Sequence, residues 1–213
     1  MRDLGIYLVA NTESCQPRST LEVIEGAVAA GVQWVQLRAK NETAREFFEL
    51  TCAAAELTAG KAELLVNDRI DVFLAARAAG AAVTGIHIGQ KDIAVRYARE
   101  IIGEGIIGLS ASTDEQLTGA NADAKYLDYL GVGAIRATPT KKDHPTPLGI
   151  DGFLRAKRLT ELPAVAIGSL TAADAAALRD GGAAGMAVVR AICAAEDPQA
   201  ASAELLDRWE GAK

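Results

Sequence analysis

The sequence predicts a single-domain (β/α)8 barrel over residues 1–213, and three observations support this fold class. Short apolar runs alternate eight times with longer helical patterns, in a chain near the lower size limit of such barrels. Half of the residues are hydrophobic and only 5% are aromatic, as expected where helices pack closely on strands. No break in composition marks a second domain. An open doubly wound sheet is the alternative, but it normally has fewer strands, and no GxGxxG motif follows a strand here.

The eight apolar runs give the expected strands. Strands that are buried on both faces are nearly continuous apolar runs, and the runs found here are residues 6–10, 34–38, 63–67, 85–88, 106–110, 129–133, 164–168 and 186–189. In barrels of this class the reacting groups follow the C-terminal ends of the strands. Polar residues at strand ends are therefore the candidates for a functional site.

The expected helices lie between these runs, at residues 20–30, 43–59, 69–79, 93–102, 114–124, 152–161, 171–180 and 199–210. Four of them begin with a hydroxyl residue that is followed, three positions later, by an acid or amide, which is the capping-box pattern. These pairs are Ser19 with Glu22, Thr43 with Glu46, Thr113 with Gln116 and Thr171 with Asp174. Gly31, Gly80 and Gly181 stand where helices are expected to stop.

Composition excludes several classes of protein. The net charge of −6 argues against a nucleic-acid surface, although it does not exclude a small basic pocket. The three cysteines have no CxxC spacing, which argues against a disulfide framework or a thiolate zinc site. There is no signal segment and no run of 18 apolar residues. We expect a cytoplasmic protein that does not insert into a membrane, and Ala-rich helix faces are compatible with a homo-oligomer.

The second expected strand carries an unusual polar pattern. Gln36, Arg38 and Lys40 fall at period two and so share one face, while the residues between them take the other face. Turning these polar groups into a barrel mouth is unfavourable unless they have a partner there. The alternative is a frayed strand end with solvated charges.

Two carboxylates follow neighbouring strands. Asn67 and Asp68 end the third strand, and Gln90 and Asp92 follow the fourth. Neighbouring strands are about 4.8 Å apart, so one cation could lie between Asp68 and Asp92. Hard oxygen ligands without His or Cys favour Mg²⁺, which takes one or two carboxylates and substrate phosphate oxygens. For Asp68 a simple helix cap is the alternative.

The remaining strand ends suggest anion binding. Ser110 ends the fifth strand, and the sixth leads into a stretch with Thr138, Thr140 and Lys141. Gly168, at the end of the seventh strand, would let the backbone approach a ligand, and the loops after strands seven and eight are the usual phosphate site of this fold. Caps and tight turns are the alternatives for each residue alone.

The expected gathering of cations argues for a polyanionic ligand. Arg38, Lys40 and Lys141 would repel one another by about 4 kcal/mol per pair at about 4 Å and an effective dielectric of about 20. A magnesium–pyrophosphate pocket with a second phosphate site across the mouth would balance these charges. His87 is expected to be a hydrogen-bonded imidazole in the core or pocket wall, and His144 to be solvated. No Ser–His–Asp arrangement is present.

Taken together and in this order, these motifs resemble the thiamine-phosphate synthase family. They are QLRAK at 36–40, VNDR at 66–69, HIGQKD at 87–92, GLS at 108–110, GVGAIRATPTKKD at 131–143, AIGS at 166–169 and AVVRAI at 187–192. The resemblance implies a transferase that joins 4-amino-2-methyl-5-hydroxymethylpyrimidine diphosphate to 4-methyl-5-(2-hydroxyethyl)thiazole phosphate. It releases thiamine phosphate and diphosphate.

The resemblance also implies roles for individual residues. Asp68 and Asp92 would bind Mg²⁺. The pyrimidine diphosphate would be held by Gln36, Leu37, Arg38, Ala39, Lys40, Asn67, Ser110 and Lys141, of which Arg38, Lys40, Ser110 and Lys141 are the catalytic candidates. The thiazole phosphate would be held by Thr138, Pro139, Thr140, Gly168, Val189 and Arg190.

The chain departs from the family pattern at three places. Arg190 stands where a small or hydroxylated residue is usual, Ser169 replaces a second glycine, and residues 134 and 136–137 replace Pro and Phe-Pro. Two rivals stay open at this point, a thiazole tautomerase-like isomerase and a non-catalytic barrel that binds a thiazole or pyrimidine phosphate. Both acids are present and Ser112 stands at the isomerase's His position, which favours the synthase. The 134–149 segment is long enough to act as a lid.

Overall fold

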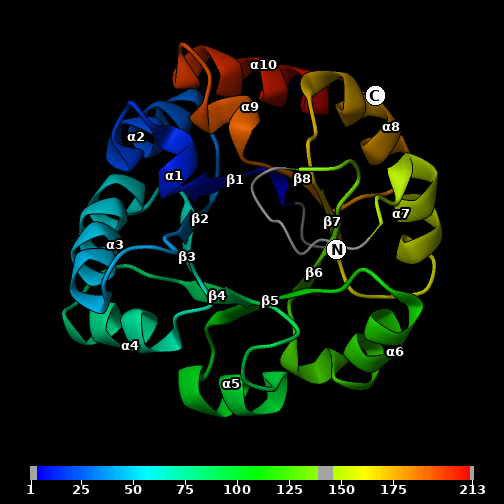
Figure 1. The fold of residues 1–213 in the computed structure, drawn as a ribbon, viewed down its shortest axis with the longest axis horizontal. Helices are drawn as coiled ribbons and strands as arrows, with labels where there is room; N and C mark the ends of the chain where they lie inside the picture. Colours follow the sequence, from blue (N-terminus) through cyan, green and yellow to red (C-terminus); the bar gives the residue numbers. More distant parts are fainter. Residues whose placement is uncertain (1–3, 139–145, 212–213) are drawn as a thin grey trace.

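The computed structural model describes residues 4–138 and 146–211, and these form a closed barrel of eight parallel strands (Figure 1). Each strand pairs with the next in chain order, and β8 pairs with β1. The strands are β1 (Gly5–Asn11), β2 (Trp34–Arg38), β3 (Glu63–Asn67), β4 (Gly85–Ile88), β5 (Ile106–Ser110), β6 (Tyr129–Gly133), β7 (Ala164–Ile167) and β8 (Gly185–Val188). The predicted (β/α)8 fold is confirmed.

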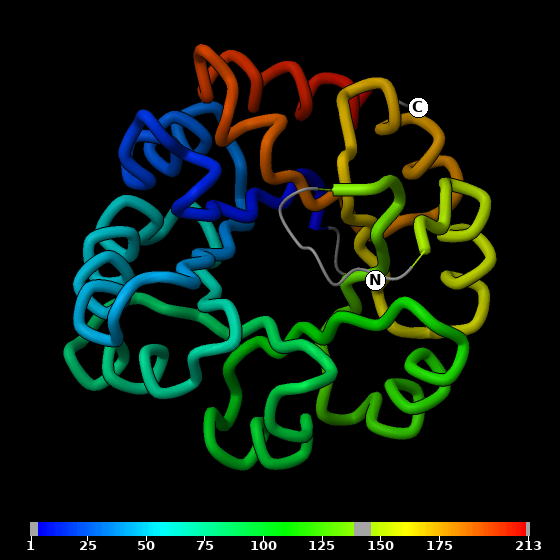
Figure 2. Tube along the Cα trace, viewed as in Figure 1, coloured from blue at the N-terminus to red at the C-terminus, as the bar shows by residue number. Residues whose placement is uncertain are grey.

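The helices form a ring outside the strands, as the chain trace shows (Figure 2). They are α1 (Thr12–Cys15), α2 (Thr20–Ala30), α3 (Ala44–Thr58), α4 (Ile70–Ala78), α5 (Val95–Ile102), α6 (Asp114–Ala122), η1 (Ala124–Tyr126), α7 (Gly149–Lys157), η2 (Ala172–Asp174), α8 (Ala175–Asp180), α9 (Arg190–Cys193) and α10 (Pro198–Glu210). The last helix, α10, packs against both α2 and α8 and so closes the ring. Among the described residues no helix is long and apolar enough to cross a membrane.

Five of the eight predicted strands have the bounds observed, and the other three differ by one residue at one or both ends. The predicted helix 152–161 is wrong at both ends, because α7 begins at Gly149 and stops at Lys157. After Lys157 the Thr160 hydroxyl accepts from the Leu162 amide at 3.1 Å, which forms a turn before β7. The predicted helix 171–180 begins as the 3₁₀ turn η2, and the short helices α1 and α9 were not predicted.

The predicted helix signals are present. Ser19 and Glu22 form a reciprocal capping box, and the same arrangement begins the other three predicted helices. Gly31 ends α2 with a left-handed φ of 107°. Gly181 does follow the last residue of α8, but its φ is −74°, and the left-handed residue is Gly182 at 80°. Gly181 is needed for space instead, since a Cβ there would lie 2.1 Å from Leu154 Cδ2.

Two apolar layers stabilise the barrel. The larger lies between the strands and the helices, and the smaller fills the interior around Tyr7, Trp34 and Tyr129. The register places Gln36 beside Val9 and Arg38 beside Asn11 on the inner face. The predicted period-two pattern of β2 is therefore confirmed, and it turns polar side chains into the barrel.

Candidate active site at the C-terminal ends of the strands

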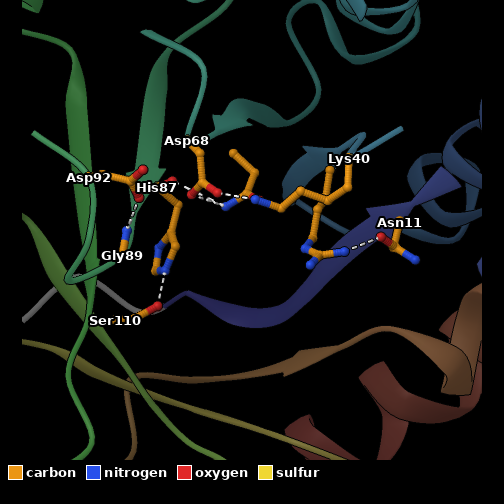
Figure 3. Close-up of polar contacts among 9 residues, drawn as sticks. Asn11, Lys40, Asp68, His87, Gly89, Asp92 and Ser110 are labelled. Atoms are coloured by element: carbon orange, nitrogen blue, oxygen red, sulfur yellow. Dashed lines mark hydrogen bonds and ion pairs between the residues drawn. The ribbon is translucent and has the colours of Figure 1, made fainter. Parts of the chain in front are cut away.

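The loop after β3 carries an acidic group that several neighbours hold in place. Asp68 has a left-handed backbone (φ 61°), a conformation that Asp tolerates better than most residues. Its carboxylate accepts from Lys40 Nζ and, at 2.9 Å, from Asn67 Nδ2 (Figure 3). Asn67 also donates to the His87 carbonyl at 3.2 Å, which ties β3 to β4. The strand ends thus fix where this carboxylate lies.

A second carboxylate, Asp92, lies in the loop after β4. Its Oδ2 accepts from the Gly89 amide at 2.7 Å (Figure 3). Burial, and then the neighbouring Asp68 carboxylate, raise the pKa of Asp92. The two acids therefore interact across adjacent strands as predicted. Two neighbouring carboxylates are the donor set that a hard divalent cation accepts when a ligand's oxygens complete its shell, and in the described part of the chain no set of three or more His, Cys, Asp or Glu residues gathers around a single point.

Arg38 lies inside the barrel mouth and is held there by an amide. Its guanidinium donates to Oδ1 of Asn11, the last residue of β1. Asn11 is buried and donates in turn to Ser14 Oγ at 2.8 Å. Arg38 is thus an ordered part of β2 and not a frayed end, whereas Lys40 lies beyond the strand with an exposed side chain.

The imidazole of His87 connects the mouth to the barrel interior. Its Nε2 lies 2.9 Å from Ser110 Oγ, and its Nδ1 lies 2.8 Å from the Tyr129 hydroxyl. Figure 3 shows the ring beneath the acidic pair and directed at Ser110. His87 is buried, which confirms the expected hydrogen-bonded imidazole in the core or pocket wall.

The loops after β6 and β7 are bound to each other through their main chains. Gly168 has a φ of 118°, and a Cβ there would lie 2.8 Å from Cα of Ala134. The amides of Ile135 and Arg136 donate to the carbonyls of Ile167 and Gly168. Gly168 therefore lets the loop after β7 pack closely against the protein's own loop after β6.

The side chain that follows Gly168 holds the same loop. Ser169 adopts a left-handed φ of 49°, and its hydroxyl donates to the Ala137 carbonyl at 2.7 Å. Serine at this place, where the family pattern has glycine, therefore supplies an extra hydrogen bond between the two loops.

An ion pair secures this side of the mouth further. Arg136 donates through both terminal nitrogens to Asp174, at 2.8 and 2.6 Å, and also to the Ser169 carbonyl at 3.1 Å. The Asp174 side chain is only 6% exposed and also accepts from the Thr171 amide. The guanidinium beside Asp174 holds the pKa of that carboxyl below its usual range. Arg136 replaces an aromatic residue of the family pattern, and through this ion pair it joins the loop after β6 to η2.

Several of the predicted substrate-binding residues do not turn their side chains into the mouth or lie outside the described residues. The side chains of Leu37 and Ala39 lie in the layer between strands and helices, so only their main chains face the mouth. Val189 and the exposed Arg190 begin α9. Thr138 is half-buried at the edge of the described chain, while Pro139, Thr140, Lys141 and His144 lie outside the described residues.

Sequence reasoning missed four polar residues that build this region. Asn11 was missed because the first strand was ended one residue early, at residue 10, which hid the polar group at its end. Tyr7 and Tyr129 stand within apolar runs. Only their hydroxyl groups, and their alternating positions that face the barrel interior, could have identified them. Asp174 was identified as a capping residue and not as a partner of Arg136.

Comparisons with known proteins agree with this geometry. Residues 6–192 match the family model described as thiamine monophosphate synthase. A thiamine-phosphate synthase of Corynebacterium efficiens is 45% identical over 92% of this chain and 90% of its own, and one from Natronomonas pharaonis is 41% identical over 99% and 97%. The solved thiamine phosphate pyrophosphorylase of Pyrococcus furiosus superimposes with a TM-score of 0.85 at 29% identity, covering 99% of this chain and 98% of that one.

Proposed function

The chain belongs to the thiamine monophosphate synthase family, and from that membership we propose that it is a thiamine-phosphate synthase, a transferase. Its substrates would be 4-amino-2-methyl-5-hydroxymethylpyrimidine diphosphate and 4-methyl-5-(2-hydroxyethyl)thiazole phosphate. The observation that carries the proposal is the pair Asp68 and Asp92, held beside Lys40 at the ends of adjacent strands. Such a pair, surrounded by donors, suits a metal-bound diphosphate.

The metal in this proposal is Mg²⁺, held by Asp68 and Asp92. When bound, it would neutralise charge on the diphosphate oxygens. Asn67 keeps Asp68 in position through its 2.9 Å hydrogen bond. The Gly89 amide does the same for Asp92. Lys40 contacts Asp68, and it can turn its ammonium group to the diphosphate.

The reaction needs charge stabilisation rather than a protein nucleophile. The carbon–oxygen bond between the pyrimidine methylene and the diphosphate breaks, with its electron pair going to the diphosphate. The thiazole nitrogen then gives its lone pair to the resulting cation and forms the new carbon–nitrogen bond. Arg38, Lys40 and Ser110 surround the place where the leaving group gains charge, and preorganised donors of this kind supply most of such catalysis.

The other half of the mouth is proposed to hold the thiazole phosphate. Gly168 follows β7, and Val189 and Arg190 follow β8 at the start of α9, which is the usual phosphate site of the fold. The family resemblance adds Thr138, Pro139 and Thr140 to this group and Lys141 to the diphosphate site. The three free cysteines agree with a reducing compartment such as the cytoplasm.

The test is the formation of thiamine phosphate and diphosphate from both substrates with Mg²⁺. The Asp92→Asn variant should lose most of the turnover and keep its affinity for the thiazole phosphate, because that substrate binds away from the acids. A folded, Mg²⁺-loaded sample that makes no product would refute the proposal. Binding of both phosphates without turnover would instead identify a binding protein, and isomerisation of a thiazole phosphate would identify the isomerase alternative.

A further inference from the structure

Five side chains from five strands form one continuous hydrogen-bonded chain through the barrel interior. Gln36 Nε2 donates to the Tyr7 hydroxyl at 3.0 Å, and this hydroxyl lies 2.7 Å from that of Tyr129. The Tyr129 hydroxyl lies 2.8 Å from His87 Nδ1, and His87 Nε2 lies 2.9 Å from Ser110 Oγ. The chain begins in the core and ends at the mouth, beside the acidic pair.

The first donor determines the direction of every later bond. An amide nitrogen can only donate, so the Tyr7 oxygen accepts from Gln36 and the Tyr7 hydrogen goes to Tyr129. Tyr129 must then direct its own hydrogen to Nδ1 of His87. An imidazole that accepts at Nδ1 carries its hydrogen on Nε2, and this hydrogen goes to Ser110. The Ser110 hydroxyl therefore accepts within the chain and keeps its own hydrogen for an acceptor at the mouth.

The opposite direction is unfavourable. Burial raises the pKa of the Tyr7 and Tyr129 phenols, so both keep their hydrogens at neutral pH. If His87 donated from Nδ1 to Tyr129 and Tyr129 donated to Tyr7, the Tyr7 hydrogen would face the Gln36 amide nitrogen, which cannot accept it. Leaving a buried hydroxyl unpaired in this way is unfavourable.

Two glycines leave room for the rings of this hydrogen-bonded series. A Cβ at Gly108 would lie 2.2 Å from the Tyr129 ring, and one at Gly131 would lie 3.0 Å from Cε1 of His87. The Tyr129 ring also packs edge-on against Trp34, with the ring centroids 6.3 Å apart. The two glycines thus provide the space that the Tyr129 and His87 rings occupy, so that both rings can form their hydrogen bonds.

We infer that this hydrogen-bonded series of side chains positions Ser110 for catalysis. Tyr129 holds His87 as the neutral Nε2–H tautomer, and His87 makes Ser110 a donor toward the anion at the mouth. The inference rests on the proposed function for the identity of that anion, a diphosphate leaving group. In this inference Tyr129 and His87 act on the leaving group through Ser110. Charge grows on the leaving group as the carbon–oxygen bond breaks, so the Ser110 hydrogen bond strengthens in the transition state and contributes to kcat.

The tautomer can be measured without any substrate. The chain has two histidines, so ¹⁵N-histidine labelling gives a simple spectrum, and a His144→Gln variant assigns His87. The nitrogen shifts of the free protein at neutral pH should show hydrogen on Nε2 and none on Nδ1. Hydrogen on Nδ1, alone or with Nε2, would overturn the inference, whether or not the protein makes thiamine phosphate.

The kinetic test compares variants that each remove one oxygen. Tyr129→Phe should lower kcat about 10-fold and leave the KM for the pyrimidine diphosphate within about twofold, because the contact matters most in the transition state. Tyr7→Phe, one link earlier, should cost less, since Tyr129 can still donate to His87. Tyr97→Phe, on the exposed surface, is the matched control and should have no effect.

A double-mutant cycle separates positioning from a general structural effect. If Tyr129 acts through the hydroxyl, Tyr129→Phe should lower kcat no further once Ser110 is Ala. An equal loss in the Ser110→Ala background, or an unchanged His87 tautomer in Tyr129→Phe together with the same loss of kcat, would refute the inference. If the unaltered protein has no synthase activity, the proposed function fails, and the tautomer measurement still decides this inference.

Discussion

Two ion pairs at the rim of the barrel look alike and differ in what surrounds them. Lys40 contacts Asp68 with side chains that are 42% and 23% exposed, whereas Arg136 contacts Asp174 with side chains that are 49% and 6% exposed. Each pair joins the end of one strand or loop to the next. The difference lies in the acid, which is accessible in the first pair and enclosed in the second.

This difference separates ligand binding from scaffolding. An accessible pair is worth roughly 0–1 kcal/mol to folding, so its charges can turn to a ligand at little cost. The enclosed Asp174 has no such freedom, because the two guanidinium hydrogen bonds and the Thr171 amide already satisfy it. We conclude that the side of the mouth between β2 and β5 provides adjustable charge, while the side between β6 and β8 provides fixed loops.

The largest expected effect tests the adjustable side. Lys40→Gln should lower kcat/KM for the pyrimidine diphosphate about 100-fold, because it removes a cation from the developing negative charge. The free energy of unfolding should change by less than about 1 kcal/mol, since the pair is exposed. Steady-state kinetics and urea unfolding measure the two quantities. A large loss of stability with normal kinetics would contradict the comparison.

The matched substitution on the fixed side should have the opposite profile. Arg136→Gln leaves the enclosed Asp174 without its cation and should lower the free energy of unfolding by about 2 kcal/mol. The folded enzyme should keep kcat within about threefold, because Arg136 is directed at Asp174 and not at the acidic pair. Arg155→Gln, which breaks an exposed pair with Asp114, is the control and should change stability by less than about 0.5 kcal/mol.

The fold and the adjustable side could largely be predicted from the sequence. Strands buried on both faces appear as apolar runs, and period-two parity alone placed Gln36 and Arg38 on the inner face. Asp68 and Asp92 needed only the rule that neighbouring parallel strands end at the same rim. These are local signals, which a single sequence contains.

The fixed side and the interior chain could not be predicted, because they depend on pairings that no local pattern specifies. Arg136 and Asp174 are 38 residues apart, and Tyr7 and Tyr129 are 122 apart. The start of α7 was also hidden, since Leu148 offers no side-chain cap at its first turn. A tertiary contact of this kind becomes visible only when the barrel has closed.

The pH dependence of stability should distinguish the two pairs further. The pKa of Asp174 is lowered, chiefly by the hydrogen bonds from Arg136, so its contribution is complete above the unfolded value of about 3.9 and is lost as the pH falls below it. The stability difference between the parent and Arg136→Gln should therefore be constant above about pH 5 and shrink toward pH 3. Urea unfolding across this range measures it, and a difference that grows on acidification would contradict the assignment.

The smallest expected effect concerns Ser169, where two terms oppose each other. Ser169→Gly relieves a left-handed φ of 49°, which costs a non-glycine residue about 1 kcal/mol, and it removes the hydroxyl that donates to Ala137. That hydrogen bond is worth about 1 kcal/mol, so the free energy of unfolding should change by less than about 1 kcal/mol in either direction. Activity tells the two terms apart, because the hydrogen bond from Ser169 to Ala137 helps to hold the loop after β6 in place, whereas the backbone strain does not. If loop placement matters for the thiazole phosphate, its KM rises at unchanged stability, whereas an unchanged KM would show that Arg136 and the main-chain hydrogen bonds are sufficient to hold this side of the mouth.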